Sequence, residues 1–194
     1  MKYIKLTLTL LCLSFSLQSC FVAGAAAGAA AIVVVYDHRT ISNTLEDTKI
    51  ANKIVANLSA YKKLWKDSHI GVTVFNHVAL LTGQTPNKEW RQLAGEISKS
   101  VEGVDKVYNQ ITIQGPTSSL TRTSDSWITT KIRTEMLAEQ NLKSSSIKVV
   151  TENGDVFLMG IVSRQQADIA VDIARKVSGV QRVIKIFSYT NPIN

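Results

Sequence analysis

The sequence predicts an α+β fold made of two copies of one small module, and three observations support this prediction. Asn153-Gly154, a strong hairpin signal, lies between two segments in which apolar and polar residues alternate. A helical pattern with a Ser163–Gln166 capping box follows, and Gly179 stands where a helix commonly ends. The same order of elements occurs about 77 residues earlier in the chain, which indicates a domain duplication.

The N-terminus has the pattern of a secretory signal peptide that ends at a lipidation site. Lys2 and Lys5 precede an apolar run over 6–17, and Cys20 follows a small residue. This ending resembles the lipobox of bacterial lipoproteins, in which the cysteine becomes the first residue and carries the acyl chains. We therefore expect a signal peptide over 1–19 and lipidation of Cys20.

The alternative is an uncleaved membrane span, because residues 6–35 are long enough to cross a bilayer. Gln18 and Ser19 interrupt that run, and residues 21–35 are too short to span alone. We favour a lipoprotein, whose acyl chains anchor it stably because each buried CH₂ contributes ~0.8 kcal/mol. Phe21 stands where inner-membrane lipoproteins carry Asp, so the resemblance implies sorting to the outer membrane.

Charge and cysteine usage narrow the classes of function. The formal net charge is +7, and loss of the signal peptide removes two lysines and no acid. A mildly basic exported domain most readily meets anionic lipid headgroups, whereas export argues against nucleic acid as a partner. Cys12 leaves with the signal peptide and Cys20 would carry lipid, so disulfides and cysteine metal sites are excluded.

The first copy is expected to occupy 44–114, after a lipidated tether over 20–43. Thr44 and Asp47 predict the start of its first helix. The remaining elements are expected in this order: paired strands over 69–75 and 78–83, a helix from Thr85-Pro86 to about Val101, and a strand over 104–113.

The second copy is expected to occupy 125–190, after a linker over 115–124 that contains Gly, Pro and a Ser/Thr cluster. The two copies align at Ile50 with Ile128, Ile54 with Ile132, Leu58 with Met136, Gly83 with Gly160, and Gly103 with Gly179. The core of a domain as short as each copy has only marginal stability by itself, so we expect the two copies to pack against each other or against a membrane.

The repeated pattern resembles the BON domain. The second copy carries it at Asn153-Gly154, Leu158, Gly160, Gly179-Val180 and Val183. The first copy departs from it at the hairpin, where Asn76-His77 replaces Asn-Gly. With the lipobox ahead, the whole chain resembles the dual-BON outer-membrane lipoproteins of Gram-negative bacteria, the family of division- and outer-membrane-stress-associated lipid-binding proteins.

This resemblance implies an αββαβ fold in each domain, with a three-stranded mixed sheet packed on two helices. It also implies that the second domain binds anionic phospholipid, for which we expect phosphatidylglycerol or cardiolipin. The implied location is the periplasmic face of the outer membrane, including the division site, and the implied role is support of outer-membrane integrity. No cofactor is implied.

The residues expected to contact lipid lie on the helix over 125–139. They are Trp127, Thr130, Lys131, Thr134 and Leu137, with Arg133 at the border. Trp is favoured at a lipid–water boundary because its ring is apolar and its N–H stays hydrated. A Lys stem can lie along apolar surface while its ammonium reaches a phosphate, and each such cation adds ~1 kcal/mol at an anionic surface.

The alternative is that Trp127 packs in the domain core or between the two domains. Lys49 and Ser59 stand in the first copy where the second has Trp127 and Leu137. A fold that accepts Lys and Ser at these positions does not need Trp and Leu to close its core. Docking between the domains remains open.

No catalytic constellation is present, so we do not expect an enzyme. The sequence has no Gly-rich phosphate loop before a helix and no Ser, His and acid cluster. His38, His69 and His77 are scattered and are expected to be surface residues rather than metal ligands. Asp168 and Asp172 lie one helical turn apart and are expected to form an exposed ion-pair ladder, whose basic members would be Arg164 and Lys176.

Two functions of different classes follow from the sequence. The leading one is a lipid-anchored protein that binds a membrane surface. The second is a protein–protein scaffold that contacts outer-membrane assembly or division proteins through a strand edge or a helix face.

Overall fold

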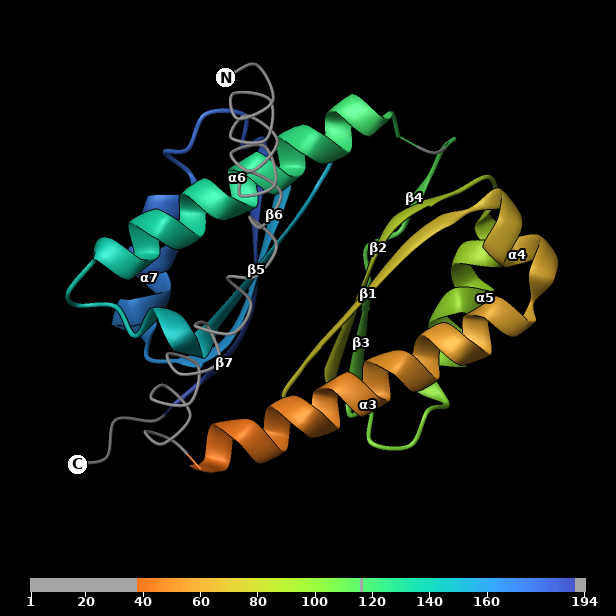
Figure 1. Ribbon diagram of the computed structural model, residues 1–194, viewed down its shortest axis with the longest axis horizontal. Helices are drawn as coiled ribbons and strands as arrows, with labels where there is room; N and C mark the ends of the chain where they lie inside the picture. The colour runs from red at the N-terminus through yellow and green to blue at the C-terminus, as the bar shows by residue number, and fades with distance from the viewer. Residues whose placement is uncertain (1–37, 116, 191–194) are drawn as a thin grey trace, which may run out of the picture. The chain divides into compact units, whose positions relative to one another are not determined.

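The computed structural model describes residues 38–115 and 117–190 of the chain (Figure 1). The signal peptide expected over 1–19, the lipidation site expected at Cys20 and most of the tether lie outside the described residues. The residues from Thr44 onward form one unit by their contacts, and this unit contains both repeats.

β2 is the central strand of the first repeat. β1 pairs with it in antiparallel orientation, while β3 and β4 pair with it in parallel. The elements are α3 (His38–Ala60), α4 (Lys62–Asp67), β1 (His69–Phe75), β2 (Val78–Thr85), α5 (Lys88–Lys99), β3 (Lys106–Asn109) and β4 (Thr112–Ile113). The strand expected over 104–113 is thus divided in two. The Asn109 amide bonds the backbone of Arg91 and Ile111, which interrupts the ladder at this point.

The second repeat has the same order of elements around a three-stranded sheet. β6 is central, with β5 antiparallel and β7 parallel to it. The elements are α6 (Ser119–Ala138), the 3₁₀ turn η3 (Ser144–Ser146), β5 (Ile147–Glu152), β6 (Asp155–Val162), α7 (Arg164–Ala174) and β7 (Arg182–Tyr189). The predicted α+β class, with a mixed sheet and two main helices in each repeat, is confirmed.

Each repeat builds one core between its two main helices and one face of its sheet. The helix stripes expected at Ile50, Ile54 and Leu58 on α3, and at Ile128, Ile132 and Met136 on α6, are buried as predicted. Residues of α5 and α7 complete the two cores because their apolar side chains recur at helical spacing.

The opposite sheet faces contribute a third apolar cluster within the unit that begins at Thr44. Its buried members are Leu80 of β2, Phe157 and Met159 of β6, and Ile186 of β7. Successive strand residues point to opposite faces, and β2 and β6 are buried on both sides. The two copies therefore cover each other's second sheet face, as their small size led us to expect.

Three helices begin at other residues than the sequence predicts. α6 begins at Ser119 rather than at Asp125, because the Ser118 hydroxyl accepts a bond from the Thr121 N–H and caps the helix. α3 begins at His38, ahead of Thr44, and Asn87 rather than Thr85-Pro86 caps α5. Of the described helices, none combines the length and the apolar character needed to cross a bilayer.

Candidate functional site

One face of α6 presents strongly exposed apolar side chains. Leu120, Trp127 and Leu137 are 79%, 54% and 77% exposed. At 100° per residue they fall within an arc of about 120° that also contains Thr130, Lys131 and Thr134, opposite the buried stripe of the helix. We call these six residues the α6 face. The structure brings together five of the six lipid-contacting residues expected from the sequence.

Leu120 is the member of the α6 face that the sequence analysis missed. It lies in the segment 115–124, which was expected to be a linker, and the early start of α6 puts it two helical turns before Trp127. The face therefore extends from Leu120 to Leu137, which is about 25 Å along the helix axis at 1.5 Å per residue.

The hydroxyl groups on this side of α6 bond to the helix itself. Thr130 Oγ1 donates to the Ser126 carbonyl at 2.9 Å, and Thr134 Oγ1 donates to the Thr130 carbonyl at 3.0 Å. Thr123 and Ser126 make the same bond four residues back. Because these donors are satisfied internally, the two threonines of the face can lose water without leaving an unpaired hydroxyl donor.

The two cationic side chains of the expected site, Lys131 and Arg133, differ in how freely they can bind a phosphate. Lys131 is half-exposed, and its Nζ lies 3.3 Å from Glu135 Oε1 in an i,i+4 pair that is worth only ~0.3–0.5 kcal/mol. Its ammonium can therefore exchange that partner for a phosphate. Arg133 instead donates from Nη2 to the Val149 carbonyl at 3.1 Å, so its guanidinium is turned toward β5.

Trp127 does not take part in packing between the repeats. The apolar cluster that joins the two sheets consists of strand residues, and Trp127 is absent from it. The indole is instead more than half exposed within the described part of the chain. The structure thus favours an exposed role for Trp127 over docking between the domains.

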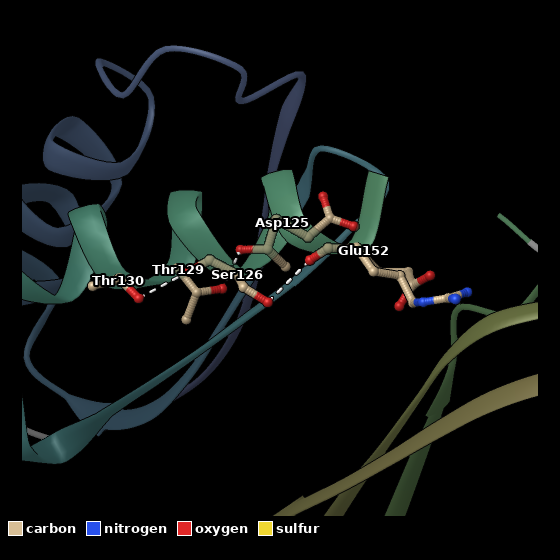
Figure 2. A pocket seen from close by; sticks show the side chains of 7 residues that line it. Asp125, Ser126, Thr129, Thr130 and Glu152 are labelled. Carbon is tan, nitrogen blue, oxygen red and sulfur yellow. Dashed lines mark hydrogen bonds between the residues drawn. The ribbon is translucent and has the colours of Figure 1, made fainter. Parts of the chain in front are cut away.

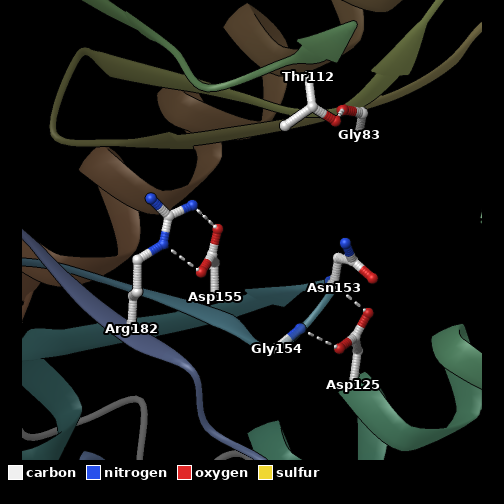
Figure 3. Close-up of polar contacts among 7 residues, drawn as sticks. All are labelled: Gly83, Thr112, Asp125, Asn153, Gly154, Asp155 and Arg182. Atoms are coloured by element: carbon white, nitrogen blue, oxygen red, sulfur yellow. Dashed lines mark hydrogen bonds and ion pairs between the residues drawn. The ribbon is translucent and has the colours of Figure 1, made fainter. Parts of the chain in front are cut away.

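A buried aspartate fastens α6 to the hairpin of its sheet (Figure 3). Asp125 accepts the Asn153 N–H at 2.7 Å and the Gly154 N–H at 2.9 Å, both in the turn between β5 and β6. On the other side of this turn, Arg182 Nε donates to Asp155 Oδ1 at 2.8 Å. Asp125 therefore fastens α6 to the hairpin turn, and the Arg182–Asp155 pair joins β7 to the same end of β6.

The first repeat holds its hairpin in the same way. Asp47 is also buried and accepts the N–H groups of Asn76 and His77 at 2.7 and 2.9 Å. Both turns have two residues with positive φ, which is typical of the two-residue hairpins that the sequence predicts. His77 thus stands where the second repeat has Gly154.

His77 has a raised pKa because of its surroundings. Its Nδ1 donates to the Gly103 carbonyl at 2.8 Å, and this bond is the largest cause of the raised pKa. Burial acts in the opposite direction, and the negative charges of Glu46, Asp105 and Asp47 raise the pKa further. The fold therefore stabilises the imidazolium form of His77 relative to a free histidine side chain.

We expect the stabilisation by His77 to depend on pH. A group whose pKa is raised by folding contributes its full stability below the unfolded value of about 6.5, and loses it as pH rises through the folded value. Replacing His77 with Gly, which copies the second repeat, should therefore lower the unfolding temperature more at about pH 6 than at about pH 9. A difference between parent and variant that stays constant with pH would contradict this expectation.

A hollow of about 390 Å³ lies between α6 and the end of β5 (Figure 2). The polar groups that line the hollow already form hydrogen bonds within the chain. Thr129 Oγ1 donates to Thr151 Oγ1 at 2.7 Å, Ser126 Oγ donates to the Arg122 carbonyl at 3.0 Å, and Asp125 holds the hairpin turn. We assign no ligand to this hollow.

The ion-pair ladder expected along α7 is wrong. Asp172 pairs with Arg175 at 3.1 Å, and the guanidinium of Arg164 lies 4.8 Å from the ring centre of Tyr189. The physical reason is that α7 ends before Lys176, so this residue does not continue the helix face. Over 38–115 and 117–190, no three His, Cys, Asp or Glu residues lie close enough together to hold a metal ion.

These features define a protein of two tandem αββαβ modules, of which the second carries an exposed apolar and cationic helix face. The family profile described as "BON domain" matches residues 46–115 and 124–191. The chain belongs to the BON domain family and contains two such domains.

Three relatives resemble most of the chain. It is 36% identical over 173 residues to "Outer membrane lipoprotein DolP" of Haemophilus influenzae, covering 89% of this chain and 90% of that protein. It is 37% identical over 153 residues to "21 kDa hemolysin" of Actinobacillus pleuropneumoniae, covering 79% of each chain. It is 30% identical over 146 residues to "Osmotically-inducible protein Y" of Escherichia coli, covering 74% of this chain and 72% of that one.

Proposed function

We propose that this chain is an outer-membrane lipoprotein whose second BON domain binds anionic phospholipid through the α6 face. The similarity to an outer-membrane lipoprotein over 89% of the chain supports this location, together with the lipobox that ends at Cys20. The protein would lie on the periplasmic face of the membrane, including the division site, and would support outer-membrane integrity by binding phosphatidylglycerol or cardiolipin there.

One observation carries this proposal. α6 exposes an indole and two leucines on a face whose threonine hydroxyls are already bonded to the helix. Single exposed apolar residues are common on folded proteins, but several large ones on one face commonly mark a contact site, where burial removes the cost of their contact with water. A membrane interface removes that cost, and it also satisfies the indole N–H and the ammonium of Lys131.

The expected binding energy between the α6 face and the bilayer is small, but it is sufficient for a domain that an anchor already holds at the membrane. Full burial of an apolar side chain contributes ~2 kcal/mol, so partial insertion of one indole and two leucines provides a few kcal/mol at most. An acyl anchor on Cys20 would hold the domain near the bilayer at an effective concentration of about 1 mM. At that concentration a weak contact is occupied for much of the time.

Replacing Trp127 with Glu is expected to weaken binding of the double domain to phosphatidylglycerol vesicles about 100-fold. The variant loses ~2 kcal/mol of apolar burial and adds ~1 kcal/mol of repulsion from the anionic surface. Binding is measured by co-sedimentation of residues 38–194 with vesicles; this part of the chain contains both cores. NMR titration is expected to shift the amide signals of α6 first.

Gln165→Glu is the matched control for this experiment. It makes the same change of charge at an exposed position on α7 of the same domain. We expect it to bind vesicles almost as the parent does. Equal binding by Trp127→Glu and Gln165→Glu would contradict the proposal. Crosslinking from residue 127 to a periplasmic protein, without vesicle binding, would favour the scaffold function instead.

A further inference from the structure

The first domain carries an aromatic and cationic patch of its own on the short helix α4. Tyr61 and Trp65 are 49% and 40% exposed. The lysines between and beside them, Lys62, Lys63 and Lys66, are exposed as well, while Leu64 is buried and fixes the helix on the first core. We call the two aromatic residues and the three lysines the α4 patch.

In the part of the chain that the structure describes, the lysines of the α4 patch form no ion pairs. Lys53 of the same domain, by contrast, pairs with Glu102. Trp65 also lies outside the apolar cluster of the first core. The patch is therefore available to an outside partner.

Comparison of the two repeats indicates that the fold does not require this patch. Leu142 is buried in the second core as Leu64 is in the first. The residues around Leu142 are Glu139, Gln140, Asn141, Lys143 and Ser144, which include no aromatic side chain and have no net charge. The same position in the fold thus tolerates polar residues that include no aromatic ring and carry no net charge, so the aromatic rings and lysines of α4 are not needed to close the core.

We propose that α4 is a second membrane-contacting site and that it binds anionic phospholipid headgroups independently of the α6 face. Aromatic rings interleaved with lysines suit the boundary of an anionic bilayer, because the rings enter the interface while the ammonium groups reach phosphates. This domain also follows the expected lipid anchor directly in the chain. The inference rests on the proposed membrane function of the protein, but not on the α6 face.

The three tryptophans of the chain allow both sites to be followed separately. They are Trp65 on α4, Trp90 packed against the first core, and Trp127 on α6. Three variants each keep one of them and replace the other two with Phe. The full-length lipidated proteins are inserted in vesicles whose phospholipids carry brominated acyl chains, which quench indole fluorescence on contact.

We expect Trp65 to lose fluorescence in phosphatidylglycerol vesicles, and not in phosphatidylcholine vesicles, whereas Trp90 keeps its fluorescence in both. Equal quenching of Trp65 and Trp90 would overturn the inference, and so would equal quenching of Trp65 in the two lipids. Quenching of Trp127 tests the α6 face in the same vesicles. Quenching of Trp65 without quenching of Trp127 would support the α4 site and contradict the α6 site. Quenching of Trp127 without quenching of Trp65 would support the α6 site and contradict the α4 site.

A charge variant gives a second test. Changing Lys62, Lys63 and Lys66 to Gln should weaken the contact of Trp65 about 100-fold, because each lysine near an anionic surface contributes about fivefold. The same change at Lys53, Lys88 and Lys99, which are exposed elsewhere in the first domain, should leave Trp65 quenching nearly intact. Equal loss in both variants would mean that overall charge rather than α4 binds the lipid, and would overturn the inference.

Discussion

Replacing Gly83 with Ala is expected to destabilise the first domain by about 4 kcal/mol or more, which approaches the whole stability of a unit this small. Gly83 has a φ of +102°, which L side chains rarely adopt. An added Cβ would also lie 2.0 Å from the carbonyl oxygen of His69 in the paired strand. The clashing atom belongs to the backbone, so no side-chain rotation can relieve it, and the pairing of β1 with β2 must open.

Hydrogen exchange of the β1 and β2 amides, measured together with thermal unfolding, would detect this opening. Gly160, the corresponding residue of the second domain, has an ordinary φ, and its Cβ would lie 2.6 Å from the Ser146 carbonyl. Gly160→Ala should therefore destabilise the protein less than Gly83→Ala. Gly115 has no atom within 4 Å of an added Cβ, so Gly115→Ala should change little. Similar stability of the Gly83 and Gly115 variants would refute this expectation.

Replacing Asp125 with Ala is expected to destabilise the second domain by about 3 kcal/mol. The change removes two hydrogen bonds to a charged acceptor, each worth ~1.5–3 kcal/mol, and leaves the Gly154 N–H buried without a partner. The contact between α6 and the hairpin turn should loosen as a result. Chemical denaturation would give the free energy of unfolding, and exchange of the Asn153 and Gly154 amides would report the loss locally.

The first domain and α7 supply the controls for Asp125. Asp47 makes the same pair of bonds, so Asp47→Ala should destabilise the first domain by a similar amount. Asp168 is exposed on α7, and Asp168→Ala is expected to stay within ~0.5 kcal/mol of the parent. If Asp125→Ala were no worse than Asp168→Ala, the two bonds to the turn would contribute nothing to stability.

The sequence predicts those parts of the fold that local chemistry decides. Asn153-Gly154 supplies the positive φ values of its turn, and Ile128, Ile132 and Met136 are spaced to share one helix face. The residue at which α6 begins could not be predicted from the local sequence. Many Ser and Thr residues between 117 and 126 can cap a helix. A long-range contact precedes the chosen cap, since the N–H of Thr117 bonds Gln84 Oε1.

In the candidate site too, the sequence predicts what local spacing decides and does not predict what long-range contacts decide. The duplication made Trp127 and Leu137 stand out, because a change between two copies of one fold marks residues that the core does not need. Leu120 was missed because it depends on where α6 begins. The orientation of Arg133 depends on a carbonyl 16 residues away, and the role of Asp125 depends on a turn 28 residues away. Spacing along one helix carries no information about either partner.

The hydroxyl bonds along α6 have a consequence for kinetics. A surface that must break hydrogen bonds to water on every approach would face a barrier to entering and to leaving the headgroup layer. The Thr130 and Thr134 side chains keep the same bonds in both surroundings. Under the proposed function, we therefore expect short residence times and rapid exchange of the α6 face at the bilayer, while the acyl chains proposed on Cys20 would keep the molecule at the membrane.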